Sequence, residues 1–375
     1  MKLFDVYPLY DITPVSAKGV ILTDDKGQEF LDLYGGHAVI SIGHGHPHYI
    51  NRLKEQIDKI GFYSNAVQNP LQLELAEKLG RLSGCNEYQL FLCNSGAEAN
   101  ENALKLASFH TGKSRVIAFH NSFHGRTSAA VATTDNPAIN APINKQQKVS
   151  FLAFEDIDAF KHAVKKGDVC AVILEAIQGV GGLDEPTTTF YQQVAKICKK
   201  HGVVLIADEV QSGFGRSGKF FAFQHHGIEP DIISIAKGMG NGFPVGGILI
   251  HPRIKASHGL LGTTFGGNHL ACAATLAVLE VLEEEKLISK AQELGRYFTE
   301  KALQIPEVKR VKGKGLMLGL EFDFEVAPIR KKLIYDQHIF TGSAKDKKVL
   351  RILPALTIHK THIDHFFDAL KQVLA

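Results

Sequence analysis

The sequence predicts an α/β fold in which a large domain, built on a mostly parallel sheet, is joined to a smaller α+β domain. Between about residues 85 and 250, short β-branched or apolar segments alternate with segments of helical periodicity, which is typical of a parallel sheet covered by helices on both faces. The length of 375 residues exceeds the usual size of one hydrophobic core. From about residue 288 onward, helical patterns mix with strand-like segments, which predicts the second domain.

The large domain is expected to contain seven strands, most of which end at or just before a polar residue. In open α/β sheets, ligands bind outside the carboxyl ends of the strands, so these polar residues are the first candidates for a functional site. The expected strands are residues 89–93, 115–119, 149–154, 170–175, 203–208, 231–236 and 247–250.

The remaining elements lie towards the two ends of the chain. Residues 19–33 are typical of a hairpin, which we expect to pack on the smaller domain. A helix over 270–285 leads out of the sheet domain, and strand-like segments follow at 316–322 and 349–353. A final amphipathic helix begins near Thr361. The expected division is an N-terminal segment over 1–48, a large domain over 49–272 and a C-terminal small domain over 273–375.

Composition and charge limit the classes of function. A formal net charge of +3, with both signs interspersed, gives no global basic field, so nucleic acid is not an expected partner. No apolar segment approaches the roughly 18 residues that cross a bilayer, and residues 1–8 lack the apolar core of a signal peptide. The five cysteines are odd in number, far apart and without CxxC spacing, so they are expected to be reduced thiols. We therefore expect a soluble, cytoplasmic protein.

The chain has 18 histidines, and three of them, His44, His46 and His48, occupy every second position of one short segment. Because no acidic or cysteine residues accompany them there, we interpret this segment, which Gly and Pro interrupt, as a turn and expect no metal. A metal site built on these histidines is the alternative.

Lys237 follows the apolar strand expected at 231–236 and is itself followed by glycines. An amine at such a strand end is partly desolvated, which lowers its pKa and frees it for imine formation with an aldehyde. In isolation, the segment also fits a lysine whose stem packs in the protein while its amine reaches water.

A second apolar strand, at 203–208, ends on the carboxylate of Asp208. Pyridoxal phosphate requires an acidic partner for its ring nitrogen, because a protonated ring is the better electron sink. Asp208 fits that role, while Val210 is placed to press on a ring face and Gln211 to donate to the phenolic oxygen. The alternative is that Asp208 and Glu209 are solvated acids in a loop.

Residues 93–100 turn from a strand into a helical pattern through small side chains. Backbone amides at a helix start bind phosphate, and small residues let the phosphate approach closely. Ser95, Gly96 and Ala97 are therefore expected to form a phosphate cradle, to which Thr264 adds a hydroxyl. Taken alone, such a turn is common in proteins of many functions.

Phe123 and Arg126 follow the strand expected at 115–119. An aromatic ring can stack on a cofactor ring, and the planar guanidinium of an arginine binds a carboxylate through two hydrogen bonds. A core aromatic beside a surface ion pair is the alternative for this segment. Together, however, the four segments supply an amine, an acid, a ring stack and a phosphate cradle at predicted strand ends, which is the set of groups that pyridoxal phosphate requires.

With these residues, the chain resembles the class III aminotransferases and, among them, the acetylornithine aminotransferases most closely. The resemblance runs from about Tyr7 to the end of the chain. It is carried by residues 31–44, Pro47 and residues 94–100, 123–127, 208–216, 231–247, 264–268 and 351–354.

The resemblance implies a fold-type-I homodimer with shared active sites, in which Thr264 reaches the phosphate of the neighbouring subunit. It implies that Glu175 and Gln178 lie near the cofactor. Arg126 would bind the α-carboxylate of the donor, and Arg351 the carboxylate of the acceptor. The implied ping-pong reaction moves the terminal amino group of N-acetyl- or N-succinyl-ornithine to 2-oxoglutarate, giving glutamate in arginine biosynthesis, with the lysine as proton shuttle.

Two departures from the family pattern bear on the substrate. Val180 stands where the family pattern has a glutamate, and in ornithine aminotransferases a glutamate masks the arginine that matches Arg351. If that glutamate is the one replaced, the pocket is cationic and favours an anionic acyl group such as succinyl. His37 lies where related enzymes face the substrate with tyrosine or small apolar groups, so it either contacts the acyl chain or is a structural histidine.

Two other functions stay open. Another ω-aminotransferase, acting on ornithine, 4-aminobutyrate or a diamine, carries the same cofactor groups, as does the related semialdehyde aminomutase. A cofactor-binding protein without turnover belongs to a different class. The complete set of Lys237, Asp208, Arg126 and Glu175 argues against it.

Overall fold

A computed structural model describes all 375 residues, and three sheets organise it. The large sheet has seven strands in the order β4-β10-β9-β8-β7-β5-β6. Every expected strand of this domain is present, with bounds within two residues of those predicted. The strands are β4 (Gln89–Cys93), β5 (Arg115–Phe119), β6 (Val149–Leu152), β7 (Val169–Leu174), β8 (Val204–Asp208), β9 (Ile232–Ile235) and β10 (Gly246–Ile250).

The large sheet is mostly parallel, as predicted, but β10 runs antiparallel to both of its neighbours, β4 and β9. Only residues 236–245 connect β9 to β10, and parallel strands need a crossover of about a dozen residues or more. Strand β10 therefore begins at the edge where the parallel strands end. At its start, a Cβ on Gly246 would lie 2.7 Å from the carbonyl oxygen of Ser95, so the two segments are in close contact.

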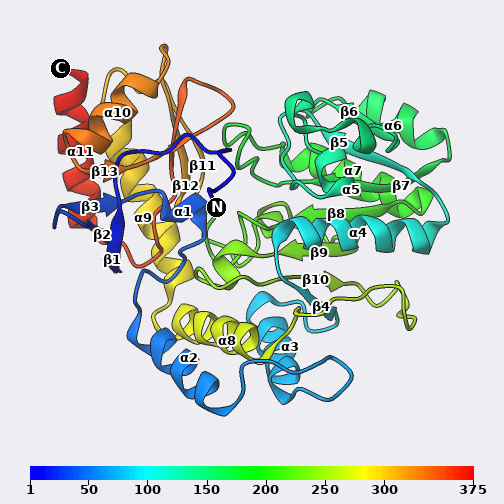
Figure 1. Cartoon of the computed structure of the whole chain (residues 1–375). Helices are drawn as coiled ribbons and strands as arrows, with labels where there is room; N and C mark the ends of the chain where they lie inside the picture. Colours follow the sequence, from blue (N-terminus) through cyan, green and yellow to red (C-terminus); the bar gives the residue numbers. More distant parts are fainter.

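Helices cover both faces of the large sheet (Figure 1). Successive residues of β7 alternate between two apolar clusters, Val172 and Leu174 facing one and Ala171 and Ile173 the other, so the strand is buried on both sides. Helix α4 supplies the second cluster, and α6, α7 and α8 contribute to the first. The helices of this part are α2 (Pro47–Lys59), α3 (Pro70–Ser83), α4 (Gly96–Thr111), α5 (Ser128–Ala132), α6 (Ile157–Lys165), α7 (Thr188–His201) and α8 (His269–Glu284), with α8 packed on α2 and α3.

Two four-stranded sheets form the smaller part of the molecule, in the orders β1-β2-β3-β13 and β11-β12-β15-β14. The predicted hairpin is present as β2 and β3, and β3 pairs with β13 from the C-terminal region, so the hairpin packs on the smaller part as expected (Figure 1). The elements are β1 (Pro14–Lys18), β2 (Ile21–Asp24), β3 (Glu29–Asp32), α1 (Gly35–Ala38), α9 (Leu287–Ala302), β11 (Arg310–Lys314), β12 (Met317–Glu321), α10 (Ala327–Tyr335), β13 (Ile339–Phe340), β14 (Gly342–Ser343), β15 (Val349–Ile352) and α11 (Lys360–Leu374).

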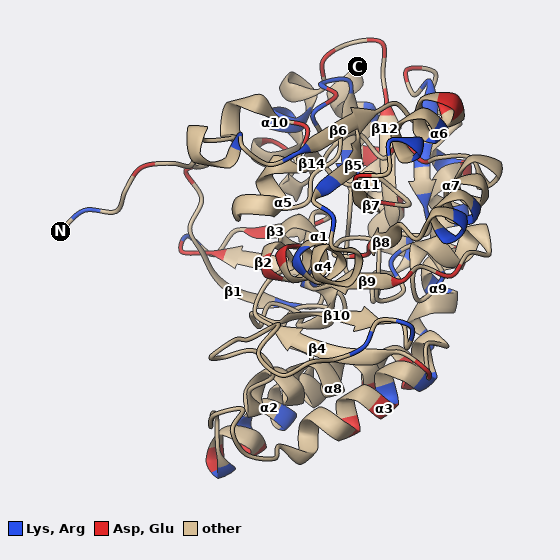
Figure 2. Ribbon diagram, turned by 90° about the vertical axis from the view of Figure 1, so that its right-hand side faces the viewer, with Lys and Arg blue, Asp and Glu red and all other residues tan.

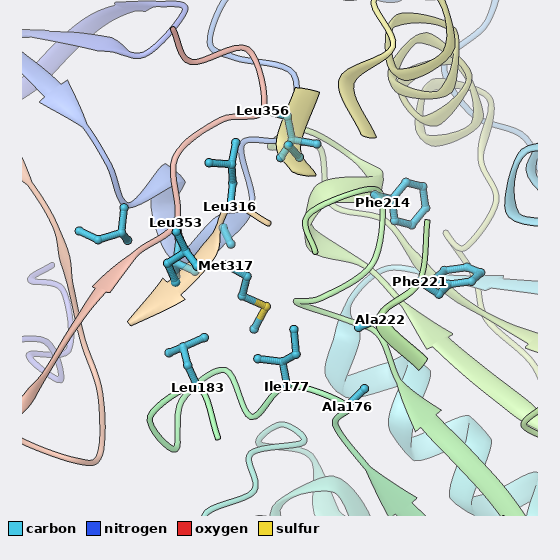
Figure 3. Packing of buried hydrophobic residues seen from close by; sticks show 14 of the residues in the cluster. Ala176, Ile177, Leu183, Phe214, Phe221, Ala222, Leu316, Met317, Leu353 and Leu356 are labelled. Carbon is cyan, nitrogen blue, oxygen red and sulfur yellow. The ribbon is translucent and has the colours of Figure 1, made fainter. Parts of the chain in front are cut away.

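An apolar contact joins the two parts beside the strand ends of the large sheet. Ile177 and Leu183, from the loop after β7, lie next to Met317 of β12 (Figure 3). A buried contact of this kind fixes the loop after β7 against the smaller part, which matters because that loop also reaches the site described below.

The surface carries charge of both signs, with acidic and basic side chains together on α3 (Figure 2). The first residues extend away from the body of the molecule in the same view, and Leu3, Phe4 and Leu9 are almost fully exposed. None of the helices combines the length and apolar character needed to span a membrane.

Candidate active site

A cavity of about 370 Å³ opens at the carboxyl ends of the parallel strands. Its walls come from the segments after β4, β5, β7, β8 and β9, so residues far apart in the sequence meet at the edge where ligands of open α/β sheets bind. Among the lining residues are ten of those expected at the site: Ser95, Gly96, Ala97, Phe123, Arg126, Glu175, Asp208, Val210, Gln211 and Lys237.

Lys237 begins the short 3₁₀ helix η4 (Lys237–Met239) directly after β9. Its φ of 47° lies in the left-handed region that non-glycine residues rarely adopt, a conformation that costs of order 1–3 kcal/mol and must be held by its surroundings. Burial lowers the pKa of its amine, although the negative charges of Asp208 and Glu175 oppose this effect. The lowered pKa increases the share of neutral, nucleophilic amine.

Asp208 ends β8 and is 4% exposed. Its Oδ2 accepts hydrogen bonds from Nδ2 of Asn100 and Nδ1 of His124, both at 2.7 Å. Its Oδ1 accepts from the backbone amide of Val210 at 3.0 Å. These donors compensate for the burial of the carboxylate and fix its orientation towards the cavity.

Asn100 and His124 line the cavity but were not identified from the sequence. A signal was available, because both lie in segments, 94–100 and 123–127, that carry the family resemblance. Asn100 is also a polar residue on the buried face of α4, where an unpaired amide would be costly.

Glu175 follows β7 and connects two of the loops that form the cavity. Its carboxylate accepts from the backbone amide of Phe123 at 3.0 Å and from that of Gly179 at 2.8 Å. Burial raises its pKa to about 7. Glu175 therefore positions Phe123, the expected ring stack, from the neighbouring strand.

The start of α4 has the properties of a phosphate site. Ser95 caps the helix, and its Oγ accepts from the amide of Glu98 at 3.2 Å, which leaves the hydroxyl proton free to donate. A Cβ at Gly96 would lie 2.5 Å from Cγ1 of Val210, so only glycine allows the two segments to pack this closely. The first amides of a helix have no partner within it and attract an anion.

Gln211 contacts the turn that contains His37. Its Nε2 donates to the carbonyl oxygen of His37 at 3.1 Å, whereas its buried Oε1 has no partner. The sequence led us to expect donation to a phenolic oxygen, but the atom that the structure leaves available is an acceptor for a hydroxyl. An unpartnered acceptor, a buried acid, an amine and an open helix start match the hydroxyl, ring nitrogen, aldehyde and phosphate of pyridoxal phosphate.

Comparison with known proteins decides the family. The sequence profile of Aminotransferase class-III matches residues 6–374, which is nearly the whole chain. The chain belongs to the class-III aminotransferases. It is therefore an aminotransferase that depends on pyridoxal 5′-phosphate and acts on small amino and keto acids, as the sequence predicted.

Relatives and solved structures support this membership over the full length of the chain. The acetylornithine aminotransferase of Bacillus subtilis (strain 168) is 40% identical, over 100% of this chain and 98% of that protein. That of Aquifex aeolicus is 40% identical, over 99% of each chain. The crystal structure of the ornithine aminotransferase from Toxoplasma gondii ME49 is 27% identical, covers 98% of this chain and 91% of its own, and superposes with a TM-score of 0.91. The predicted fold-type-I architecture is thereby confirmed.

Four of the residues expected at or near the site of this aminotransferase do not line the cavity, and one of them, Gln178, donates from Nε2 to the carbonyl oxygen of His120 at 2.7 Å. Thr264 is exposed in the loop before α8, while Arg351 lies buried in β15. His37 lies in the turn after β3, where burial and the positive charges of Arg351 and Lys237 together lower its pKa.

His44, His46 and His48 each contact a different acidic residue. His44 contacts Asp32, His46 contacts Glu285 and His48 contacts Glu280. No group of three His, Cys, Asp or Glu side chains in the structure is arranged to hold a metal ion.

Proposed function

We propose that this aminotransferase moves the terminal amino group of an N-acylated ornithine to 2-oxoglutarate, giving the N-acyl-glutamate semialdehyde and glutamate, as in arginine biosynthesis. The observation that carries the proposal is the similarity to acetylornithine aminotransferases of Bacillus subtilis and Aquifex aeolicus, each 40% identical over nearly all of both chains. The proposed donors are N-acetylornithine and N-succinylornithine, which differ only in the acyl group.

Arg126 supports a donor with an α-carboxylate. Its side chain is exposed, lines the cavity and takes part in no ion pair within the chain. A guanidinium that faces a cavity without a carboxylate partner is a receptor for a substrate carboxylate. Arg351, in contrast, is proposed to bind the carboxylate of the acceptor.

The chemistry follows from the side chains around the cavity. Pyridoxal phosphate, when bound, supplies an electron sink for the electron pair left behind when a proton leaves the carbon that bears the amino group. Lys237 takes this proton on Nζ and returns it, a role that its lowered pKa favours. Asp208, held by Asn100 and His124, would serve as the acidic partner of the ring nitrogen. Ser95 and the amides that follow it would hold the phosphate.

We also propose a homodimer with shared active sites. Thr264 is exposed and does not line the cavity of its own chain, and Phe265 beside it is 60% exposed. Phe265 forms an exposed aromatic pair with Phe62, at a ring distance of 5.4 Å. Exposed aromatic side chains next to a residue expected at an active site support contact with a second copy.

A comparison of amino donors tests the proposal. Glutamate formation from 2-oxoglutarate would be followed with N-acetylornithine, N-succinylornithine, ornithine and 4-aminobutyrate, and kcat/KM compared. We expect an acylated donor to exceed both unacylated donors by about tenfold or more, since selective contacts contribute 1–3 kcal/mol. A preference for ornithine or 4-aminobutyrate would overturn the proposal. A strong preference for the acetyl over the succinyl donor would contradict the hypothesis, based on Val180, that the acyl group is anionic.

A further inference from the structure

Arg351 is a buried cation whose direct hydrogen-bond partners are neutral. The side chain is 4% exposed, and its Nε donates to the carbonyl oxygen of Ser343 at 2.5 Å and its Nη1 to that of Gly179 at 2.7 Å. None of the ion pairs of the structure includes it. Burying a guanidinium without an anion is costly, so this residue is prepared for a carboxylate that the chain itself does not provide.

Tyr34 covers the guanidinium. The Cζ atom of Arg351 lies 5.9 Å from the centroid of the tyrosine ring, within the range of a cation–π contact. The other edge of the ring packs against the backbone, since a Cβ at Gly342 would lie 2.7 Å from Cε2 of Tyr34. Burial raises the pKa of the phenol, and Arg351 only opposes this effect, so the group that covers the cation is uncharged at neutral pH.

His37 holds the hydroxyl of Tyr34. The phenolic oxygen forms a short hydrogen bond with Nδ1 of His37, and the ring centroids are 4.7 Å apart. The phenol can donate to this nitrogen when the imidazole proton is on Nε2. The neutral form of the imidazole is favoured, since burial and the charges of Arg351 and Lys237 lower the pKa of His37.

A strained turn positions His37. All four residues of α1, Gly35–Ala38, have φ between 54° and 68°, so the turn is left-handed, and two of them are not glycine. Such a turn persists only when its surroundings hold it. Gln211 does so by donating to the carbonyl oxygen of His37 at 3.1 Å, and Val39, which follows the turn, lines the cofactor cavity.

We propose that Tyr34 and His37 form a neutral, displaceable cap on Arg351, which a substrate carboxylate must move aside to reach the guanidinium. An uncharged cap leaves the attraction of the cation for anions in place, whereas an anionic cap would cancel it. The strength of the Tyr34–His37 hydrogen bond then sets the affinity for a second carboxylate, and so the selectivity between monocarboxylates and dicarboxylates. The inference rests on the proposed role of Arg351 as receptor for the acceptor's carboxylate.

Calorimetric titration of the holoenzyme with glutarate tests the cap without turnover. Glutarate carries two carboxylates but neither an amino nor a keto group, and butyrate serves as the matched monocarboxylate. In Tyr34→Phe, which keeps the ring but removes the hydroxyl, glutarate should bind about three- to tenfold more tightly, because one neutral hydrogen bond no longer has to be broken. Butyrate affinity should stay unchanged. An unchanged or weaker affinity for glutarate in this variant would overturn the proposal.

Three further variants separate the cap from general effects. His37→Ala should strengthen glutarate binding like Tyr34→Phe, and His37→Gln, which retains an acceptor for the phenol, should stay close to the unmodified protein. The control Tyr335→Phe, at an exposed tyrosine that contacts Tyr10, should change nothing. Equal affinities in His37→Ala and the unmodified protein would show that His37 does not hold the cap.

The double variant Tyr34→Phe with Arg351→Gln separates the proposed cap from the proposed role of Arg351 as receptor for the acceptor's carboxylate. If the cap acts on Arg351, the gain from Tyr34→Phe disappears when the guanidinium is absent. If Arg351→Gln alone leaves glutarate binding unchanged, the proposed acceptor role of Arg351 fails, whatever the cap does. A different preferred amino donor would overturn the proposed function but would leave these titrations unaffected.

Discussion

His124 donates from Nδ1 to Oδ2 of Asp208 across 2.7 Å, and its side chain has no exposed surface. The bond assigns the proton to Nδ1, because an ionised carboxylate can only accept. The Nε2 atom of the same ring is buried without a partner in the chain. His124 thus orients Asp208, the acid proposed to pair with the cofactor ring, and Asn100 donates to the same carboxylate from α4.

Removing His124 should reduce turnover more than substrate binding. Hydrogen bonds to charged groups contribute about 1.5–3 kcal/mol, so we expect His124→Ala to lower kcat by about 10- to 100-fold if Asp208 loses its orientation. The values of KM should change little, because His124 is not placed to bind substrate. Steady-state kinetics checks this, with His110→Ala near the end of α4 as control. A variant with normal kcat would show that Asn100 and the amide of Val210 suffice to hold the acid.

Lys237 should be the residue to which the cofactor becomes attached. Borohydride treatment of the holoenzyme, followed by peptide mass spectrometry, should add the reduced cofactor to the peptide that contains position 237. The variant Lys237→Ala should lose both the label and amino-group transfer, because no other amine lines the cavity. Label on another lysine would contradict the assignment.

The cavity residues were predictable because the chemistry of this fold is concentrated at strand ends, and strand ends are marked in the sequence. Asp208 ends one apolar strand and Lys237 follows another that is apolar except for Ser234, so a single rule located both. Their convergence in one cavity needed no knowledge of loop conformation. The bounds of the strands were predictable for the same reason, since β-branched segments end where polar residues begin.

Other features depend on contacts that sequence periodicity does not encode. The direction of β10 follows from the length of a connection, and the orientation of Gln211 from the carbonyl oxygen of His37, which lies 174 positions away in the chain. The left-handed φ of Lys237 and of His37 also arises from tertiary contacts, since local preference favours neither.

The pH dependence of the free energy of unfolding should reveal the raised pKa of Glu209. This residue is 1% exposed and accepts from the amides of Ala222 and Phe223 and from Oγ of Ser212. Burial raises its pKa to about 7, from an ordinary value of 4.5. Between these two pH values the folded state keeps a proton that the unfolded state has lost, so the free energy of unfolding falls as pH rises.

We expect this one group to remove about 3 kcal/mol of stability across the window from pH 4.5 to 7, with the full contribution present below it. Glu209→Gln, which cannot ionise, should flatten the dependence measured by urea unfolding at several pH values. The exposed control Glu307→Gln should reproduce the unmodified curve. Parallel curves for Glu209→Gln and the unmodified protein would show that the carboxyl ionises normally in the folded state.

Mixing two defective chains should reveal whether Thr264 serves the neighbouring subunit. Thr264→Ala should weaken cofactor binding by about three- to tenfold through loss of one hydrogen bond, and Lys237→Ala should abolish turnover. In a hybrid dimer of these two chains, the site that contains Lys237 lies on the Thr264→Ala chain. If the threonine comes from the neighbour, that site regains an intact set of groups. Measured at limiting pyridoxal phosphate, activity should therefore rise when the two variants are unfolded, mixed and refolded together. If Thr264 acts within its own chain, no site in the mixture is complete, and the activity should not exceed that of the Thr264→Ala chain at the same concentration.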